Sequence, residues 1–132
     1  ILKVKSNVDS GMFLPIQQAA VEALKNPSSW HKKRNEEYKK RRKKAWELLD
    51  NIQCSYSRVQ SRMFVWAKIN HRTTMSEEFV ENILQKSNVF ITPGFIFGKN
   101  GKNHVRISLS SDTDTIEEAI QRIKKVNATF TN

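Results

Sequence analysis

Hydrophobic positions recur at helical spacing in the first part of the chain. We expect a first helix that Asp9 or Ser10 caps and that runs to about Leu24. Its apolar positions are Phe13, Ile16, Ala20 and Leu24. The Asn-Pro-Ser-Ser segment at 26–29 then ends this helix and begins a long, highly charged one over about 29–52. The second helix has a narrow apolar stripe formed by Tyr38, Ala45, Leu48, Leu49 and Ile52.

After residue 52 the pattern changes to that of strands. Residues 62–69 are rich in β-branched and aromatic side chains and predict a buried strand, with 55–59 as its partner. Residues 89–91 and 104–109 predict two more strands. Turns at Pro93-Gly94 and Asn100-Gly101 separate them.

Two further helices are expected around these strands. Thr74 and Glu77 form a possible capping box for a helix that runs to about Lys86. Its inward positions are Phe79, Val80, Ile83 and Leu84. Asp114 and Glu117 begin the last helix. Its inward stripe is Ile116, Ala119, Ile120, Ile123 and Val126.

The order of these elements predicts an α+β fold. Two helices, strands, a helix, strands and a closing helix are typical of two layers, a small and mostly antiparallel sheet with helices packed on one face. The length of 132 residues suits one domain with a real core. A hydrophobic content of 38% and a charged content of 27% are those of a soluble globular protein. No apolar run approaches the roughly 20 residues of a membrane span, so no membrane partner is expected.

The cysteine and histidine residues argue against a disulfide and a metal site, and they indicate a reducing compartment. Cys54 is the single cysteine, which leaves no internal disulfide and fits a reducing, cytoplasmic setting. The segment 1–5 lacks the apolar block of a signal peptide. The three histidines, His31, His71 and His104, have no second ligand at helical spacing, so no metal site is expected.

The net charge of +10 is concentrated in one segment. Residues 32–44 hold nine basic residues against two glutamates, a local net charge of +7. On the helix 29–52 this run could lie against phosphates, and a nucleic-acid-binding module is the alternative function that it suggests. No helix-turn-helix, zinc-finger or RNA-recognition signature accompanies it. A solvated helix face is the interpretation that we favour, and no nucleic-acid partner is expected.

Arg106 is the most informative single residue, because it lies between Val105 and Ile107 in an otherwise apolar strand. Three glycines precede it, at Gly94, Gly98 and Gly101, where the backbone must turn tightly or approach a ligand closely. A guanidinium can donate two parallel hydrogen bonds to a carboxylate, which lysine cannot do. From the pattern alone, a solvent-facing strand arginine is the commoner interpretation.

Phe64 and Trp66 occupy alternate positions of the predicted strand and share one face. Two neighbouring rings can form a stacking site for a ligand. We expect them to pack in the core instead.

Three segments in register resemble the C-terminal part of class I and II pyridoxal-phosphate aminotransferases, the aspartate-aminotransferase-like group of fold type I. The first is 4–11, VKSNVDSG, followed by Phe13 and the QQAA of 17–20. The second is Tyr38 with the arginine pair 41–42 and the Leu-Leu at 48–49, followed by the MFVWAK of 63–68. The third runs from Pro93-Gly94 through Phe97-Gly98 and Gly101 to the VRIS of 105–108. Order and spacing match along nearly the whole chain.

The resemblance implies roles for two residues. Arg106 matches the arginine that binds the α-carboxylate of the substrate, which makes amino acids and 2-oxo acids the expected ligands. Asn7 matches a position that approaches the active site of the partner subunit, which implies a homodimer. A turn or cap residue is the equally weighted alternative for Asn7. The glycine usually found before the Met-Phe-x-Trp strand is Arg62 here, which raises the question of the local backbone geometry.

The resemblance also implies what this chain lacks. The family's Schiff-base lysine lies in a Ser-x-x-Lys motif upstream of the matched segments, and no lysine here has that context. We therefore expect no catalytic and no cofactor-binding residue in the chain, with pyridoxal phosphate bound by the longer parent protein. Residues 1–26 are expected to trail from the missing large domain as a helix, and 27–132 to form the C-terminal small domain. Such a fragment of an aminotransferase is expected to be inactive alone, and a non-catalytic scaffold of the same fold remains a third possibility.

Overall fold

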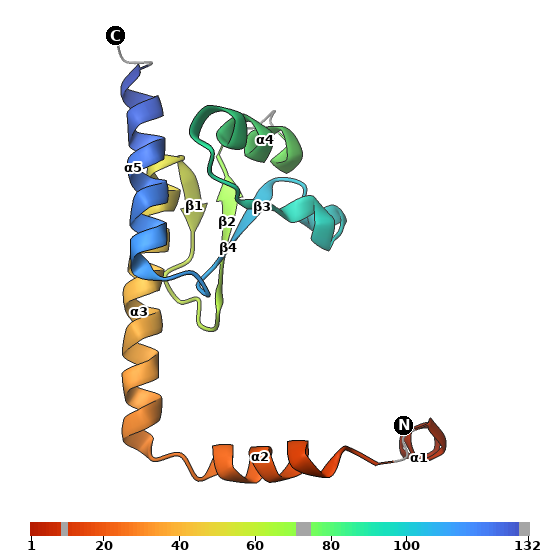
Figure 1. Ribbon diagram of the computed structural model, residues 1–132. Coiled ribbons are helices and arrows are strands. Elements are labelled where there is room, and N and C mark those ends of the chain that lie inside the picture. Colours follow the sequence, from red (N-terminus) through yellow and green to blue (C-terminus); the bar gives the residue numbers. More distant parts are fainter. Residues whose placement is uncertain (9–10, 71–74, 130–132) are drawn as a thin grey trace. The chain divides into compact units, whose positions relative to one another are not determined.

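The computed structural model describes residues 1–8, 11–70 and 75–129. By its contacts the chain divides into two units, Ile1–Asn35 and Glu36–Asn132, and each is described by itself. Figure 1 gives the order of the elements along the chain. Among the described helices, none combines the length and the apolar character that a membrane crossing requires. The expected division at residue 26 refers to the domains of a longer protein and stays a prediction.

The first unit contains α1 (Leu2–Val8), α2 (Leu14–Leu24) and the start of α3 (Ser28–Asn51). The single helix predicted from Asp9 or Ser10 is wrong at its beginning, since α2 begins only at Leu14 and a separate helix precedes it. Pro15 explains the late start, because its ring fits the first turn of a helix but would clash with a carbonyl four residues earlier. The predicted caps themselves lie outside the described residues.

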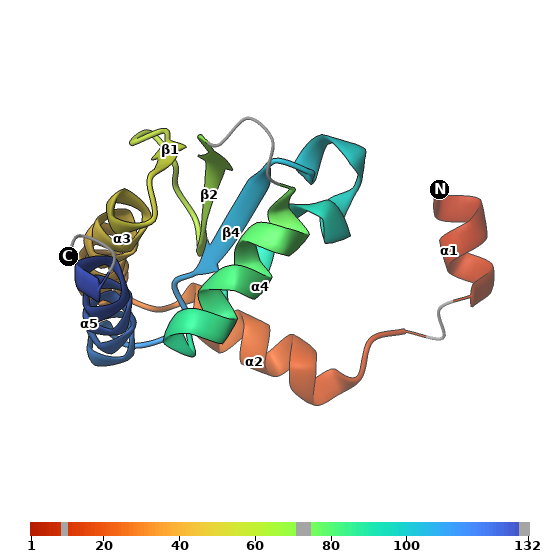
Figure 2. The ribbon, with the colours of Figure 1, turned by 90° about the horizontal axis from the view of Figure 1, so that it is seen from above.

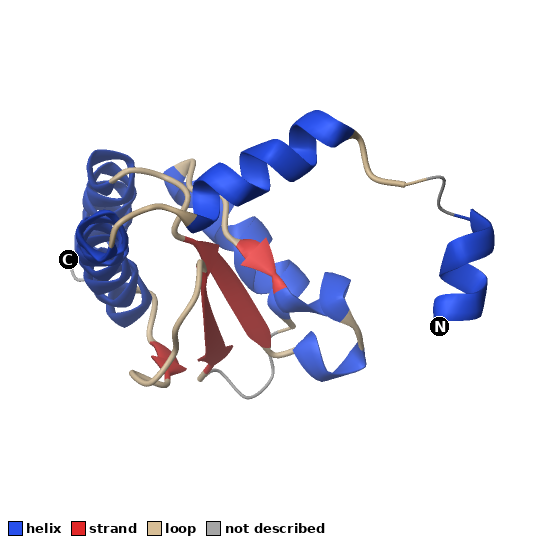
Figure 3. Ribbon diagram, turned by 90° about the horizontal axis from the view of Figure 1, so that it is seen from below, coloured by secondary structure: helices blue, strands red, loops and turns tan. Residues whose placement is uncertain are grey.

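The second unit is built on a four-stranded antiparallel sheet in the order β1-β2-β4-β3 (Figures 1 and 2). Its strands are β1 (Cys54–Tyr56), β2 (Phe64–Ile69), β3 (Thr92–Pro93) and β4 (His104–Ser108). The remaining helices are α4 (Ser76–Ser87) and α5 (Thr113–Thr129). The predicted α+β class is therefore confirmed (Figure 3).

One face of the sheet packs on the helices and forms the core. Val65, Ala67 and Ile69 of β2 are buried, and they join one cluster with residues of all three helices. The helical members are Ala45, Leu48 and Leu49 of α3, Val80 of α4, and Ile116, Ile120 and Ile123 of α5. The opposite face, here the outer face, carries the alternate positions, of which Phe64 and Lys68 are exposed and Trp66 is half-buried.

Residues 89–91 do not form the predicted strand. Val89 and Ile91 are buried and Phe90 is exposed, so the side chains alternate as in a strand. The backbone nevertheless pairs with β4 only at Thr92 and Pro93. The segment 88–92, β4 and α5 line a groove of about 460 Å³. The two predicted turns are short 3₁₀ helices, η1 (Gly94–Phe97) and η2 (Lys99–Gly101).

Two predicted helix starts shift by one or two residues. Met75 is the residue before α4, and Thr74 of the expected capping box lies outside the described residues. Asp112, two residues earlier than expected, caps α5, because its Oδ1 accepts a hydrogen bond of 2.7 Å from the backbone N–H of Thr115.

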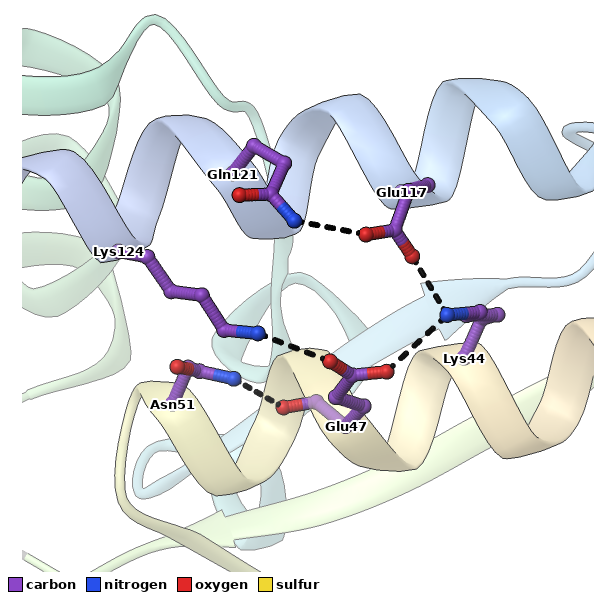
Figure 4. A network of polar contacts seen from close by, with 6 residues as sticks. All are labelled: Lys44, Glu47, Asn51, Glu117, Gln121 and Lys124. Atoms are coloured by element: carbon purple, nitrogen blue, oxygen red, sulfur yellow. Dashed lines mark hydrogen bonds and ion pairs between the residues drawn. The ribbon is translucent and has the colours of Figure 1, made fainter.

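A polar network joins α3 to α5 (Figure 4). Lys44 forms ion pairs with Glu47 at 3.2 Å and with Glu117 at 2.5 Å. Lys124 reaches Glu47 from α5 at 3.0 Å. The hydrogen bonds lower the pKa of both glutamates, that of Glu47 chiefly through Lys124 and that of Glu117 chiefly through Lys44. The same contacts raise the pKa of Lys44, with Glu117 as the main cause.

Acid is expected to weaken this network. A carboxylate whose pKa is lowered on folding stabilises the fold above its ordinary value of 4.5, and this stabilisation is lost as the pH falls through the folded pKa. Thermal melts should therefore show Tm falling between about pH 5 and about pH 3. The double variant Glu47→Gln, Glu117→Gln should show a flatter profile over this range, and an equally steep one would contradict the assignment.

Cys54 is a buried thiol on β1. Burial raises its pKa to about 12, so the thiolate is scarce at neutral pH and the residue is an inert part of the core.

Arg62, which stands where the family usually has glycine, adopts a left-handed backbone conformation with φ of 77°. A side chain is strained in this region, which glycine enters freely. The conformation is held in place partly by Arg42 of α3, whose Nη2 donates a hydrogen bond of 2.6 Å to the Arg62 carbonyl.

Replacing Arg62 by glycine is therefore expected to stabilise the fold by about 1 kcal/mol, since the strain is relieved and the carbonyl remains. Urea denaturation of the 132-residue chain measures this. Arg62→Ala is the matched control, because it removes the same side chain and keeps the strain, and its stability should stay near that of the wild type. Equal stabilities for the glycine and alanine variants would contradict the prediction.

Candidate functional site

Arg106 lies on the outer face of the sheet. On β4 it pairs with Trp66 of β2 on one side and with Thr92 of β3 on the other. Its neighbour Val105 points to the core and is fully buried. Arg106 is half-buried on the opposite face, so the sheet presents this guanidinium on the side away from the helices.

Two phenyl rings contact the guanidinium of Arg106. Its Cζ lies 4.3 Å from the ring centroid of Phe64 and 4.2 Å from that of Phe97. Trp66 lies beside them, edge-on to Phe97 with centroids 5.8 Å apart and stacked on His104 at 5.4 Å. We refer to Phe64, Trp66, Phe97, His104 and Arg106 as the arginine–aromatic cluster.

The cluster corrects the expectation that Phe64 and Trp66 pack in the core. Phe64 is 42% exposed, whereas the core positions of β2 are its aliphatic residues Val65, Ala67 and Ile69. Phe64 and Trp66 share their face of β2 with Lys68, and the charge of Lys68 is the one signal within the strand that this face is the outer one. Phe97 was not predicted as a neighbour of Arg106, although the resemblance includes it, because no local pattern links η1 to β4.

The polar atoms of Arg106 are available for a ligand. Among the described residues, none makes a hydrogen bond or an ion pair with the Arg106 side chain, and its Nε is buried without a partner. A buried donor without an acceptor is costly, and a carboxylate would satisfy it. Since Cζ lies over both rings and no polar contact of the described residues uses a guanidinium N–H, a pair of these N–H groups is left to donate parallel hydrogen bonds.

Close contact between two glycines positions Phe97. A Cβ atom on Gly101 would clash with the backbone of Gly94, and one on Gly94 would come within 2.6 Å of the His104 carbonyl oxygen. Gly98 follows Phe97 with φ of 113°, a conformation that side chains rarely adopt. These glycines allow η1 and η2 to pack together beside the end of β4.

Ser76 fastens this turn to α4. The side chain is fully buried, and its Oγ accepts a hydrogen bond of 3.3 Å from the N–H of Phe95. Its own N–H donates one of 2.7 Å to the Lys102 carbonyl. Both 3₁₀ helices are thus tied to the beginning of α4.

Asn7, the second candidate site residue, lies in α1 of the first unit, whereas Arg106 lies in the second. It is exposed, and its Nδ2 donates a hydrogen bond of 2.8 Å to the Lys3 carbonyl one turn earlier. This contact is local to α1. The structure describes the two residues in separate units.

The basic run of α3 is partly committed to the fold. Arg41 pairs with Glu37 at 3.1 Å and donates hydrogen bonds to the carbonyls of Leu109 and Ser110, at 3.2 and 3.1 Å. Arg42 holds the loop before β2, and Lys44 belongs to the polar network. Three of the six consecutive basic residues at 39–44 thus have structural partners. This speaks against the nucleic-acid alternative, which needs them free.

Comparison with known proteins decides the family. The sequence pattern of the family described as aminotransferase class I and II matches residues 2–123. The chain belongs to the aminotransferase class I and II family. Members of this family depend on pyridoxal phosphate, and the predicted resemblance is confirmed.

Individual relatives agree with this assignment. The LL-diaminopimelate aminotransferase of Maridesulfovibrio salexigens is 42% identical over 124 residues, which are 94% of this chain and 32% of that protein. The LL-diaminopimelate aminotransferase of Aquifex aeolicus is 36% identical over 94% of this chain and 32% of its own length. The chain thus spans about a third of the length of the curated relatives that it matches.

Solved structures share the fold. Apo-BacF of Bacillus subtilis has a TM-score of 0.78 at 32% identity, over 95% of this chain and 34% of that one. The aromatic aminotransferase of Pyrococcus horikoshii has a TM-score of 0.74 at 31% identity, over 88% of this chain and 32% of that one.

Lysine is the residue type that would have to hold pyridoxal phosphate as a Schiff base. A Schiff base to this cofactor needs a lysine held in a pocket, with a pKa suited to attack on an aldehyde. Among the described lysines, every one is exposed except Lys44, which is half-buried and paired with two glutamates. No group of three His, Cys, Asp or Glu side chains among the described residues could hold a metal ion. The guanidinium of Arg106, which has no polar partner among the described residues, is a group suited to receive an anion.

Proposed function

We propose that this chain is the C-terminal domain of a pyridoxal-phosphate-dependent amino-acid aminotransferase, in which Arg106 binds the α-carboxylate of the substrate. The observation that supports this is the half-buried, unpaired guanidinium on the outer face of the sheet. The family membership and the one-third share of the relatives' length support it as well.

Arg106 acts in this proposal by orientation. A bidentate pair of hydrogen bonds from a guanidinium fixes both the position and the rotation of a carboxylate. The bonds at Cα are then fixed as well, and a Cα–H bond held in line with a base reacts faster because fewer orientations have to be sampled. Pyridoxal phosphate would supply the electron sink in the complete enzyme, held by residues outside this chain.

The α-carboxylate is the part of the substrate that Arg106 recognises in this proposal. The relatives and solved structures include an LL-diaminopimelate aminotransferase and an aromatic aminotransferase, names that point to amino acids with different side chains. The α-carboxylate and α-amino group are common to these amino acids and, with the keto group in place of the amine, to their 2-oxo acids. A single arginine that serves both half-reactions must recognise this shared end and not the side chain.

Asn7 has a separate place in the proposal. We propose that the complete enzyme is a homodimer in which Asn7 reaches toward the active site of the partner subunit. The Asn7 side chain is exposed and therefore accessible to a partner subunit. Its hydrogen bond to the Lys3 carbonyl lies within α1, so losing this bond would not disturb the rest of the fold. Asn7→Ala should then alter kcat/KM of the dimer without changing its stability, and unchanged kinetics would overturn this part.

The test compares the full-length protein with the 132-residue chain. Purified full-length protein supplied with pyridoxal phosphate should transfer amino groups from an amino acid to a 2-oxo acid. The chain alone should show no transfer under the same conditions. Activity in the isolated chain, or none in the full-length protein with any of a panel of amino acids, would overturn the proposal.

A further inference from the structure

We propose that Phe64 and Phe97 are positioning residues that hold the Arg106 guanidinium in the plane in which it meets a carboxylate. The inference rests on the proposed function of Arg106 and assigns it two partners. Neither ring touches the substrate in this account, since both act through the arginine.

The two rings reach Arg106 from different elements. Phe64 pairs with Ser108 across the β2–β4 ladder and is therefore the diagonal neighbour of Arg106 on the outer face. An aromatic side chain spans such a diagonal. Phe97 comes from η1, outside the sheet, and its ring lies 4.2 Å from Cζ. Two independent parts of the fold thus converge on one guanidinium.

These contacts are the ones that order Arg106. The hydrogen bonds and ion pairs of the described residues include none to its side chain, so no polar partner fixes its rotamer. A free arginine side chain has considerable rotamer entropy, and a ligand that orders it binds more weakly for that reason. Ring contacts that fix the guanidinium beforehand remove this cost, and they take up none of its hydrogen-bond donors.

Phe97 is itself held in position by the rest of the cluster. The indole of Trp66 packs edge-on against it, and Trp66 in turn stacks on His104. The backbone of η1 is fastened by the Ser76 hydrogen bond to Phe95, two residues before Phe97. A ring supported on two sides can position its neighbour, which a loosely attached surface ring cannot.

The test uses leucine and tyrosine variants of the full-length protein. Phe97→Leu and Phe64→Leu keep an apolar side chain but remove the ring, and each should raise the inhibition constant of propionate, a plain carboxylate, by about 3- to 30-fold. Phe97→Tyr keeps the ring and should therefore have the same inhibition constant for propionate as the wild type. Phe90→Leu is the matched control, since this phenylalanine is 67% exposed and its ring is outside the cluster.

A double-mutant cycle separates positioning from a general structural effect. In the Arg106→Ala background the leucine substitutions should have no further effect on propionate binding, because their partner is gone. Leucine variants with wild-type propionate binding, or with losses that persist in full without Arg106, would overturn the inference and leave the proposed function intact. If Arg106→Ala itself leaves propionate binding unchanged, the proposed function fails, and the inference fails with it.

Discussion

Replacing Arg106 by alanine in the full-length protein is expected to lower kcat/KM for amino acids by about 100- to 1,000-fold. Each hydrogen bond between charged groups contributes about 1.5–3 kcal/mol, and the substitution removes a pair of them. A loss of about 3–4 kcal/mol of transition-state binding corresponds to this factor. Both parameters should change, with KM raised because the carboxylate is bound less tightly and kcat lowered because the substrate is less well oriented. Steady-state kinetics with an amino acid and a 2-oxo acid measure both.

Arg106→Lys is the matched control for this prediction. It retains the positive charge and loses the planar fork, so its kcat/KM should lie between those of the wild type and the alanine variant. The melting temperatures of the three proteins should differ little, because the alanine variant loses two ring contacts but also removes a buried donor that has no acceptor among the described residues. Wild-type kinetics in the alanine variant would contradict the role assigned to Arg106.

Gly101→Ala is expected to have the largest effect on stability, a loss of about 3 kcal/mol. The added methyl group would overlap the backbone of Gly94, and a backbone cannot move away as a flexible side chain can. Relief requires that η1 and η2 separate, which would also shift Phe97 away from Arg106. Urea denaturation of the 132-residue chain gives the loss in stability, and the propionate inhibition constant of the full-length protein reports the shift of Phe97.

Gly98→Ala provides the comparison, because it is strained for a different reason. The space around Gly98 is open, but its φ of 113° disfavours any side chain. Its cost should be about 1–2 kcal/mol, below that of Gly101→Ala. A Gly101→Ala variant within about 0.5 kcal/mol of the wild type, the range of ordinary surface substitutions, would show that the two short helices are not in close contact.

The sequence predicted most of the second unit because its local signals agree with one another. The stripes on α3, α4 and α5 place Leu48, Val80 and Ile120 in the core, where they are found. Glycine at 94, 98 and 101 indicated a tight backbone, and two of these glycines do meet. The strand that carries Arg106 was placed within one residue of its observed end.

The remaining features depend on contacts between distant segments, which a local pattern does not contain. Phe64, Val65 and Trp66 are all apolar, and Lys68 is the single charged residue on the face of the rings, so the helices packed on Val65 are what places both rings outward. The apolar segment 89–91 predicted a strand, but whether its backbone comes within hydrogen-bonding distance of β4 depends on tertiary packing. The late start of α2 was predictable, since Pro15 was visible and its steric effect is local.

The most direct test of the carboxylate-binding role compares an amino acid with its amide in the wild-type full-length protein and in Arg106→Ala. The amide has the same side chain and α-amino group but no negative charge to pair with the guanidinium. The account predicts that the wild type favours the acid over the amide by about 100-fold or more in kcat/KM and that the alanine variant loses most of this preference. An equal preference for the acid in both proteins would contradict the account, because the carboxylate would then be recognised by a group other than Arg106.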